Sequence, residues 1–182
     1  MSTTSNLCVL AVVPPEELWP RFQAFRDVDG KQAERWPPHI TIAFPFVRPD
    51  FLSAAISTLQ ATLERFPAFD MDFQSASYLK TKKKKGASRT WHFLDPVAPS
   101  KAMLKKLIEV VYKSGLRIGE PRELTPHMSI TQAPLKESTA LSKSLNSALK
   151  ASQSLRFRVD HVCVMARKHD SNGRVVCRIP LK

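Results

Sequence analysis

The chain has 182 residues, of which 43% are hydrophobic and 24% are charged, so it holds enough apolar material for one globular domain and is not disordered. Lysine and arginine outnumber aspartate and glutamate by 28 to 16, which gives a net charge of +12 and a pI near 10.0. This balance favours polyanionic partners such as nucleic acids, phosphorylated small molecules or an anionic membrane surface, although charge that serves only solubility is the alternative.

The cysteines and the N-terminal residues indicate the compartment. Cys8, Cys163 and Cys177 stand singly among apolar residues, and this odd number without CxxC spacing argues against a disulfide framework and a zinc site. No apolar run approaches the roughly 20 residues that cross a bilayer. The first 15 residues lack the basic region and long apolar run of a signal peptide. We therefore expect a protein of the cytoplasm, with the nucleus as the alternative.

Hydrophobic periodicity predicts the elements in chain order. It predicts a buried strand at 7–13, a helix at 15–28, an alternating strand at 39–44 and an amphipathic helix at 49–66. It then predicts a hairpin of strands 69–80 and 89–96, whose basic tip holds Lys82 to Lys85. A helix at 100–115, a strand at 126–132, a helix at 137–152 and a last hairpin of strands 154–168 and 174–181 complete the chain.

Two strands carry nearly the same short motif. Residues 38–42 read PHITI and residues 126–130 read PHMSI, and the two histidines stand 88 residues apart in a chain of 182. Each motif strand is preceded and followed by a helix. The order predicts a duplicated α+β unit, with a single domain over 1–182 whose His39 half covers about 1–96 and whose His127 half covers about 97–182, allowing the lobes to interleave.

Each motif places one imidazole and one hydroxyl on the same face of its strand. Because side chains at i and i+2 of a strand point the same way, His39 shares a face with Thr41, and His127 shares a face with Ser129. If the halves pack about a pseudo-twofold axis, these four side chains meet across a cleft. One imidazole can then accept a proton from a nucleophile, the other can protonate a leaving oxygen, and the hydroxyls can donate to a phosphate. A single such histidine is usually structural, but the matched pair indicates a phosphodiester site.

HITI at 39–42 and HMSI at 127–130 resemble the two His-x-Thr/Ser signatures of the 2H phosphoesterase superfamily, which includes cyclic nucleotide phosphodiesterases and proteins called 2′-5′ RNA ligases. The resemblance implies a bilobal, pseudo-twofold symmetric α+β fold in which two antiparallel sheets line a central cleft and helices lie outside. It also implies metal-independent chemistry without a cofactor. By position, His39 and His127 become the acid–base pair, and Thr41 and Ser129 become the phosphate ligands.

Further substrate contacts are expected from aromatic and basic residues near the motifs. Phe46, Tyr78 and Trp91 are candidates for stacking on a base, and Arg89 is a candidate for a phosphate contact. For each aromatic residue the alternative is packing in the core. For Arg89 the alternative is an exposed position that only aids solubility. Alternation from the first motif places Phe44 on the core face, and a break of this register at Pro45 leaves Phe46 at the rim of the cleft.

The other titratable residues are not expected in the site. His92 and His161 lack a hydroxyl at i+2, and His169 lies in a turn-like HDSNG stretch, so all three are interpreted as structural or surface residues. Asp70 and Asp72 alternate along one strand but have no companion acidic cluster, so no metal site is expected.

The sequence therefore predicts a metal-independent phosphodiesterase that hydrolyses 2′,3′-cyclic phosphates of nucleotides or RNA ends to 2′-phosphomonoesters. The alternatives are an RNA 3′-end exonuclease, a 2′-5′ RNA ligase or 2′-5′ phosphodiesterase, and a non-catalytic basic RNA-binding module. The loop from Lys82 to Lys85 is a candidate RNA contact, with a solvated tip as the alternative. No membrane partner is predicted, and a monomer is expected.

Overall fold

A computed structural model describes residues 7–26, 35–80, 88–116, 118, 125–152, 154–167 and 171–182, so Lys82 to Lys85 and His169 lie outside the described residues. The strands in this part of the chain are β1 (Leu7–Val12), β2 (Ile40–Ala43), β3 (Phe69–Lys80), β4 (Arg89–Pro96), β5 (Met128–Pro134), β6 (Leu155–Val159), β7 (His161–Arg167) and β8 (Arg174–Pro180). The α-helices are α1 (Trp19–Arg26), α2 (Leu52–Leu63), α3 (Ala98–Tyr112) and α4 (Ser138–Ala151). Short 3₁₀ turns at Glu16–Leu18, Pro49–Phe51 and Leu135–Glu137 lead into α1, α2 and α4.

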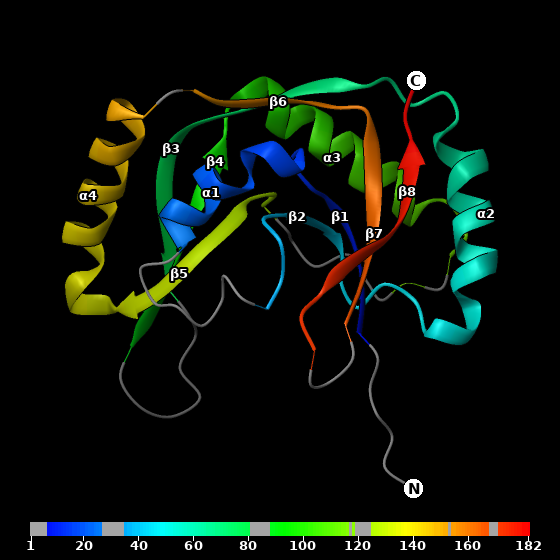
Figure 1. Ribbon diagram of the computed structural model, residues 1–182, viewed down its shortest axis with the longest axis horizontal. Helices are drawn as coiled ribbons and strands as arrows, with labels where there is room; N and C mark the ends of the chain where they lie inside the picture. The colour runs from blue at the N-terminus through cyan, green and yellow to red at the C-terminus, as the bar shows by residue number, and fades with distance from the viewer. Residues whose placement is uncertain are drawn as a thin grey trace, which may run out of the picture.

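The described strands form one curled antiparallel sheet in the order β6-β3-β4-β5-β2-β1-β7-β8 (Figure 1). The sequence predicted two sheets, whereas the two halves of this sheet join between β2 and β5 through a single residue pair, Ile40 and Met128. We call the half with β2, β1, β7 and β8 the His39 lobe, and the half with β5, β4, β3 and β6 the His127 lobe. The mixed α+β class predicted from the sequence is confirmed.

The two lobes correspond strand by strand about the β2–β5 seam. Counting outward from the seam, β2 corresponds to β5, β1 to β4, and β7 to β3. The registers agree with this correspondence, because Thr41 lies opposite Ala11 and Ser129 lies opposite Phe93. The two His-x-Thr/Ser strands are therefore the central, adjacent strands of the sheet.

One predicted element is wrong. Residues 154–168 were expected to form one strand of the last hairpin, but the chain leaves β6 at Val159, passes Asp160 and begins β7 at His161. β6 pairs with β3 at one edge of the sheet, whereas β7 pairs with β1 and β8 in the other lobe. The burial pattern changes at the same place, because apolar residues alternate along β6 and run continuously at 162–165 in β7.

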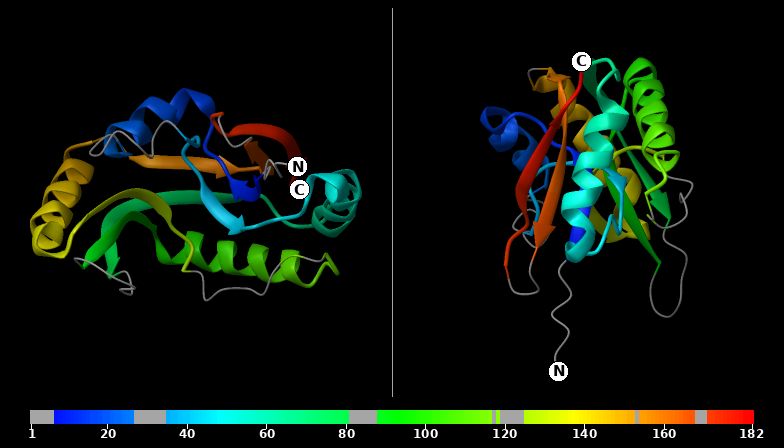
Figure 2. Two further views of the ribbon diagram at one scale, coloured as in Figure 1. Left: turned by 90° about the horizontal axis from the view of Figure 1, so that it is seen from below. Right: turned by 90° about the vertical axis from the view of Figure 1, so that its right-hand side faces the viewer.

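Most buried side chains gather on the face of the sheet that is opposite the motif histidines. This core includes Ile40 and Ile42 of β2 and Met128 and Ile130 of β5, together with the inner faces of the helices. Phe22 of α1 contacts the rings of Phe73 and Phe157 at 5.8 and 6.1 Å between centroids. In Figure 2 the helices surround the sheet, and α2 and α4 lie at opposite ends of the molecule. The isoleucines and methionine between the motif residues thus anchor the two central strands.

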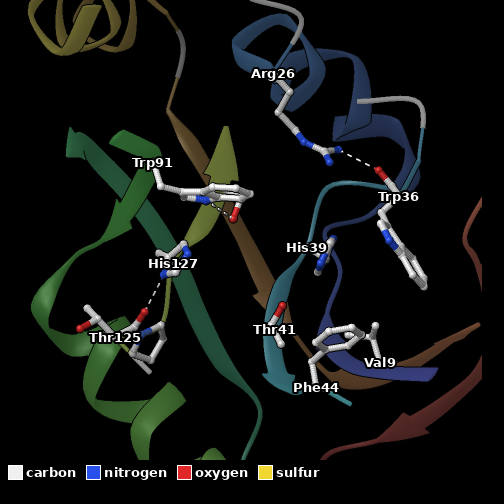
Figure 3. Close-up of a pocket in the computed structure, with 11 residues that line it drawn as sticks. Val9, Arg26, Trp36, His39, Thr41, Phe44, Trp91, Thr125 and His127 are labelled. Carbon is white, nitrogen blue, oxygen red and sulfur yellow. Dashed lines mark hydrogen bonds between the residues drawn. The ribbon is translucent and has the colours of Figure 1, made fainter. Parts of the chain in front are cut away.

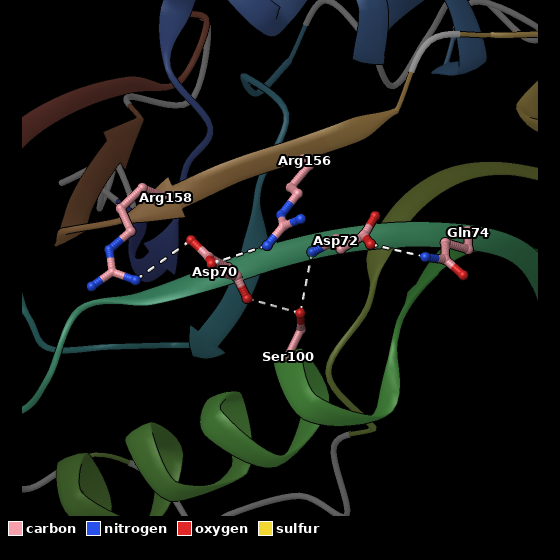
Figure 4. Close-up of polar contacts among 6 residues, drawn as sticks. All are labelled: Asp70, Asp72, Gln74, Ser100, Arg156 and Arg158. Atoms are coloured by element: carbon pink, nitrogen blue, oxygen red, sulfur yellow. Dashed lines mark hydrogen bonds and ion pairs between the residues drawn. The ribbon is translucent and has the colours of Figure 1, made fainter.

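Asp70 and Asp72 serve the packing of β3 against its neighbours (Figure 4). The Asp70 carboxylate accepts bonds from Arg156 at 3.1 Å and Arg158 at 3.4 Å, both on β6. The Ser100 hydroxyl at the start of α3 donates to the Asp70 carbonyl at 2.9 Å and accepts from the Asp72 amide at 3.2 Å. These contacts join β3 to β6 and to α3.

Candidate active site

A cavity of about 410 Å³ lies over the β2–β5 seam, on the face that carries the motif histidines (Figure 3). Its lining combines two histidines, two hydroxyls, a buried arginine and several aromatic side chains. The lining residues are Val9, Arg26, Trp36, His39, Thr41, Phe44, Trp91, Thr125, Pro126, His127 and Ser129.

The structure brings His39, Thr41, His127 and Ser129 to this one cavity. Because β2 and β5 are antiparallel and pair at Ile40 and Met128, the residues that flank this pair lie across from one another. His39 therefore neighbours Ser129, and Thr41 neighbours His127. Each imidazole is thus placed beside the hydroxyl of the other motif, and the four groups can surround one phosphorus atom.

Each histidine is oriented by a hydrogen bond to the backbone, and the two bonds are of the same kind. The His39 Nδ1–H donates to the Pro37 carbonyl at 2.8 Å, and the His127 Nδ1–H donates to the Thr125 carbonyl at 2.7 Å. Since a carbonyl only accepts, Nδ1 carries the hydrogen in each ring and Nε2 is left for a substrate. The acceptor stands two residues before each histidine, directly before Pro38 or Pro126. Residues before proline favour extended backbone, which explains the proline in both motifs.

The surroundings of His39 shift its pKa. Burial lowers its pKa to about 4; the bond to Pro37 opposes this shift, while the charges of Arg26 and His127 add to it. Arg26 is only 5% exposed and ends α1, where its guanidinium donates to the Trp36 carbonyl at 3.0 Å and to the Gln23 side chain at 2.9 Å. His39 is therefore neutral at pH 7, beside a fixed positive charge that can attract an anionic substrate.

Ser129 and His127 are held by aromatic residues of β4. The Trp91 Nε1–H donates to the Ser129 Oγ at 2.9 Å, so the hydroxyl proton of Ser129 stays available for a phosphate oxygen. The Phe93 ring lies 4.7 Å from the His127 ring, with 44° between their planes. In Figure 3, Trp91 and His127 stand on one side of the cavity and face His39, Thr41 and Trp36 on the other.

Of the other predicted substrate contacts, only Trp91 lines the cavity. Phe46 is 2% exposed and belongs to the core, while Phe44 is exposed and lines the cavity, which reverses the expected faces. β2 ends at Ala43, so strand alternation does not extend to these two residues. Tyr78 stacks on the His92 ring at 5.3 Å, and Arg89 is exposed at the start of β4, away from the cavity.

Sequence reasoning missed Arg26, Trp36 and Phe44 as lining residues. Arg26 closes a helix that looked like an ordinary amphipathic element, and nothing in its periodicity indicates the cavity. Trp36, in contrast, could have been found from the sequence, because it stands three residues before His39 in the segment that leads into the motif strand. A tryptophan so close to a candidate catalytic residue is a usable signal.

The remaining described histidines lie outside the cavity. His92 is buried, its Nε2 lies 3.1 Å from the Thr90 hydroxyl, and burial lowers its pKa. His161 lies beside Asp160, with 2.5 Å between Nδ1 and the carboxylate. Among the described residues, no group of three or more histidine, cysteine or acidic side chains is placed to hold a metal ion. In the same part of the chain, no helix is long and apolar enough to cross a membrane.

The chain resembles several solved structures over nearly its whole length. The crystal structure of TT0787 of Thermus thermophilus matches with a TM-score of 0.60 at 16% identity, covering 96% of this chain and 97% of that one. The E. coli LigT structure with 3′-AMP matches with a TM-score of 0.57 at 16% identity, covering 97% and 98%. The Usb1 structure of Kluyveromyces marxianus with uridine monophosphate matches with a TM-score of 0.52 at 16% identity, covering 98% and 99%. At this identity the likeness shows a shared fold.

The family is shown by sequence. No curated protein matches the chain. A family model described as the 2′-5′ RNA ligase superfamily, however, matches residues 14–171, a range that contains both His-x-Thr/Ser motifs. This match confirms the resemblance to the 2H phosphoesterases and supports an enzymatic function. The chain belongs to the 2′-5′ RNA ligase superfamily.

Proposed function

We propose that this protein is a phosphodiesterase that hydrolyses 2′,3′-cyclic phosphates of nucleotides or RNA ends to 2′-phosphomonoesters, with His39 and His127 as its general base and acid. The observation that carries the proposal is the convergence of both His-x-Thr/Ser pairs on one cavity, each with its Nε2 left for a substrate. The cavity volume of about 410 Å³ suits a nucleotide-sized ligand.

The reaction uses the four side chains in one displacement. The base takes a proton from a water molecule, the water oxygen forms a bond to phosphorus, and the bond from phosphorus to the 3′-oxygen breaks. The acid gives its proton to the departing 3′-oxygen, which leaves a 2′-phosphate and a free 3′-hydroxyl. The hydroxyls of Thr41 and Ser129 donate to the non-bridging oxygens, where negative charge develops.

The environment of His39 supports an assignment of roles. Since burial lowers the pKa of His39 to about 4, its imidazole is unprotonated at pH 7 and suits the base. His127 then supplies the proton to the 3′-oxygen. The hydrogen bond from Trp91 to Ser129 holds the Ser129 hydroxyl beside His39, where it can donate to a non-bridging oxygen.

The test is turnover of 2′,3′-cyclic nucleotides with EDTA present and with the phosphomonoester identified by chromatography. We expect His39→Ala and His127→Ala each to lower kcat/KM by about 10²- to 10⁴-fold. His161→Ala is the matched control, since His161 lies outside the cavity, and it is expected to keep full activity. Activity that is lost with EDTA, or that survives loss of both motif histidines, contradicts the proposal.

A second candidate uses the same site with an RNA hydroxyl in place of water, as in 3′-end trimming or 2′-5′ ligation. The net charge of +12 favours this candidate, because a polyanionic strand gains more from it than a mononucleotide does. Oligonucleotides with a 3′-hydroxyl end test trimming, and a cyclic phosphate donor mixed with a 5′-hydroxyl acceptor tests ligation, while cyclic mononucleotides alone test hydrolysis. Binding of RNA without turnover of either substrate, and unaffected by removing both histidines, would instead indicate a binding module.

A further inference from the structure

The pseudo-twofold correspondence allows the two lobes to be compared residue by residue on the face of the sheet that carries the motif histidines. Thr41 and Ser129 correspond, and their strand neighbours are Ala11 and Phe93. Two residues earlier on those neighbouring strands stand Val9 and Trp91. Val9 pairs with Met165 of β7, and Trp91 pairs with Leu79 of β3. The pair Val9–Met165 in the His39 lobe therefore occupies the place of the pair Trp91–Leu79 in the His127 lobe.

The exposure of these matched pairs differs sharply. Val9 and Met165 are 3% and 0% exposed, whereas Trp91 is half-buried and Leu79 is 53% exposed. In the His39 lobe a second apolar cluster covers the face, with Trp19 and Trp36 lying over Val9 and Met165. On the side of the sheet that carries the cavity, apolar side chains thus cover the His39 lobe, whereas the matching surface of the His127 lobe is exposed.

The open face carries apolar and aromatic side chains in one row. Leu79, Trp91 and Gln132 form a row across β3, β4 and β5, and Arg89 shares the same side of β4 as Trp91. Residues 75–94 and 125–136 contain no aspartate or glutamate, and among the described residues Lys80 ends β3 and Arg89 begins β4. An apolar and aromatic row beside cations is the surface on which unpaired bases stack.

The chemistry of the substrate decides where a longer strand must go. A cyclic phosphate is the last group of its strand, so all other nucleotides leave the cavity on the 5′ side. In the His39 lobe, Trp19 and Trp36 pack against the apolar cluster beside the cavity, so the open face belongs to the His127 lobe. The route over the His127 lobe begins at Trp91, which lines the cavity and bonds to Ser129 (Figure 3).

We propose that the face formed by Leu79, Trp91, Gln132 and Arg89 binds the nucleotides that precede the cyclic phosphate of a single-stranded RNA substrate. This inference rests on the proposed function and adds a substrate class to it. The protein then favours oligonucleotides with a 2′,3′-cyclic phosphate end over cyclic mononucleotides, and it does so by contacts outside the cavity.

The experiment measures kcat/KM for a cyclic mononucleotide and for single-stranded oligonucleotides of two to six residues with a 2′,3′-cyclic phosphate end. Leu79→Glu places a repulsive charge on the open face, and Val176→Glu makes the same change at a 43% exposed residue on β8, away from this face. Leu79→Ser removes the apolar contact without adding charge. Thermal melting checks that all three variants fold.

For the wild-type protein we expect kcat/KM to rise about tenfold or more with oligonucleotide length, as stacking of one or two bases allows. Leu79→Glu should abolish this gain, Leu79→Ser should reduce it, and Val176→Glu should retain it, while mononucleotide turnover stays within about twofold in all three. Equal turnover of mononucleotides and oligonucleotides overturns the inference and leaves the proposed phosphodiesterase intact. Equal losses in the two Glu variants also overturn it, since they would reflect general charge repulsion.

If no cyclic phosphate is turned over, the proposed function fails, and fluorescence anisotropy with a labelled single-stranded RNA still tests the face. Weaker RNA binding by Leu79→Glu than by Val176→Glu supports the proposal that this face binds RNA, and equal binding by the two variants overturns it.

Discussion

Gly173, which immediately precedes β8, allows the Trp36 ring to pack against the sheet. A Cβ at Gly173 would lie 2.0 Å from the Cε3 of Trp36 and 2.5 Å from its Cζ3. To reach ordinary contact at 3.4 Å, the ring in Gly173→Ala must move by about 1.4 Å. Trp36 lines the cavity, and its ring centroid lies 6.2 Å from that of His39, so the displacement is transmitted directly to the site.

The change in the free energy of unfolding follows from two opposing contributions, steric crowding in the folded protein and lost freedom in the unfolded chain. Forcing an extra carbon into a packed contact costs about 1–3 kcal/mol, while replacing glycine by alanine stabilises by about 0.4–1 kcal/mol through the unfolded chain. Gly173 has no left-handed φ, so alanine can adopt its backbone. We expect Gly173→Ala to lower the free energy of unfolding by about 1–2 kcal/mol. Moving the ring by more than about 1 Å beside His39 should lower kcat/KM by up to about 10²-fold.

A double-mutant cycle with Trp36→Ala isolates the contact. The three atoms nearest to the added methyl group all belong to Trp36, so Gly173→Ala should become neutral or slightly stabilising when the ring is absent. Urea denaturation followed by circular dichroism gives the four free energies, and a coupling energy of at least about 1 kcal/mol is expected. The reasoning is refuted if Gly173→Ala destabilises both backgrounds equally.

The remaining predictions concern polar groups in and near the site. Trp91→Phe keeps a ring but removes the donor to Ser129, so kcat should fall about two- to tenfold with an unchanged melting temperature; an unchanged kcat would contradict the positioning role. Thr90→Val removes the partner of the buried His92 imidazole and should lower the free energy of unfolding by about 1–3 kcal/mol in urea, whereas a neutral effect would show that this bond is dispensable. Because the pKa of His39 is about 4 when folded and near 6.5 when unfolded, the unfolded chain binds more protons between these values. Stability should therefore fall, by at most about 3 kcal/mol, as the pH is lowered from about 6.5 to about 4, and His39→Gln should lose this share of the decline when both proteins are titrated by denaturation; identical curves would contradict the shift.

The predicted acid–base pair came from features that are local in the chain. Strand alternation depends only on neighbouring backbone geometry, so it placed His39 with Thr41 and His127 with Ser129, and the isoleucines on the core face. The same rule failed at Phe44, which follows the end of β2, and the expected break of register at Pro45 did not bring Phe46 to the rim. It also failed at Asp160, where the chain leaves one lobe for the other.

By itself, therefore, the sequence determined the α+β class and predicted the four motif residues, because both depend on patterns within short segments. Only the tertiary structure placed Arg26 and Trp36 beside His39, joined the halves into one sheet at Ile40 and Met128, and closed one inner face while leaving the other open. These features depend on contacts between segments far apart in the chain. Such contacts leave no periodic pattern in the sequence, because they join residues that become neighbours only when the chain is folded.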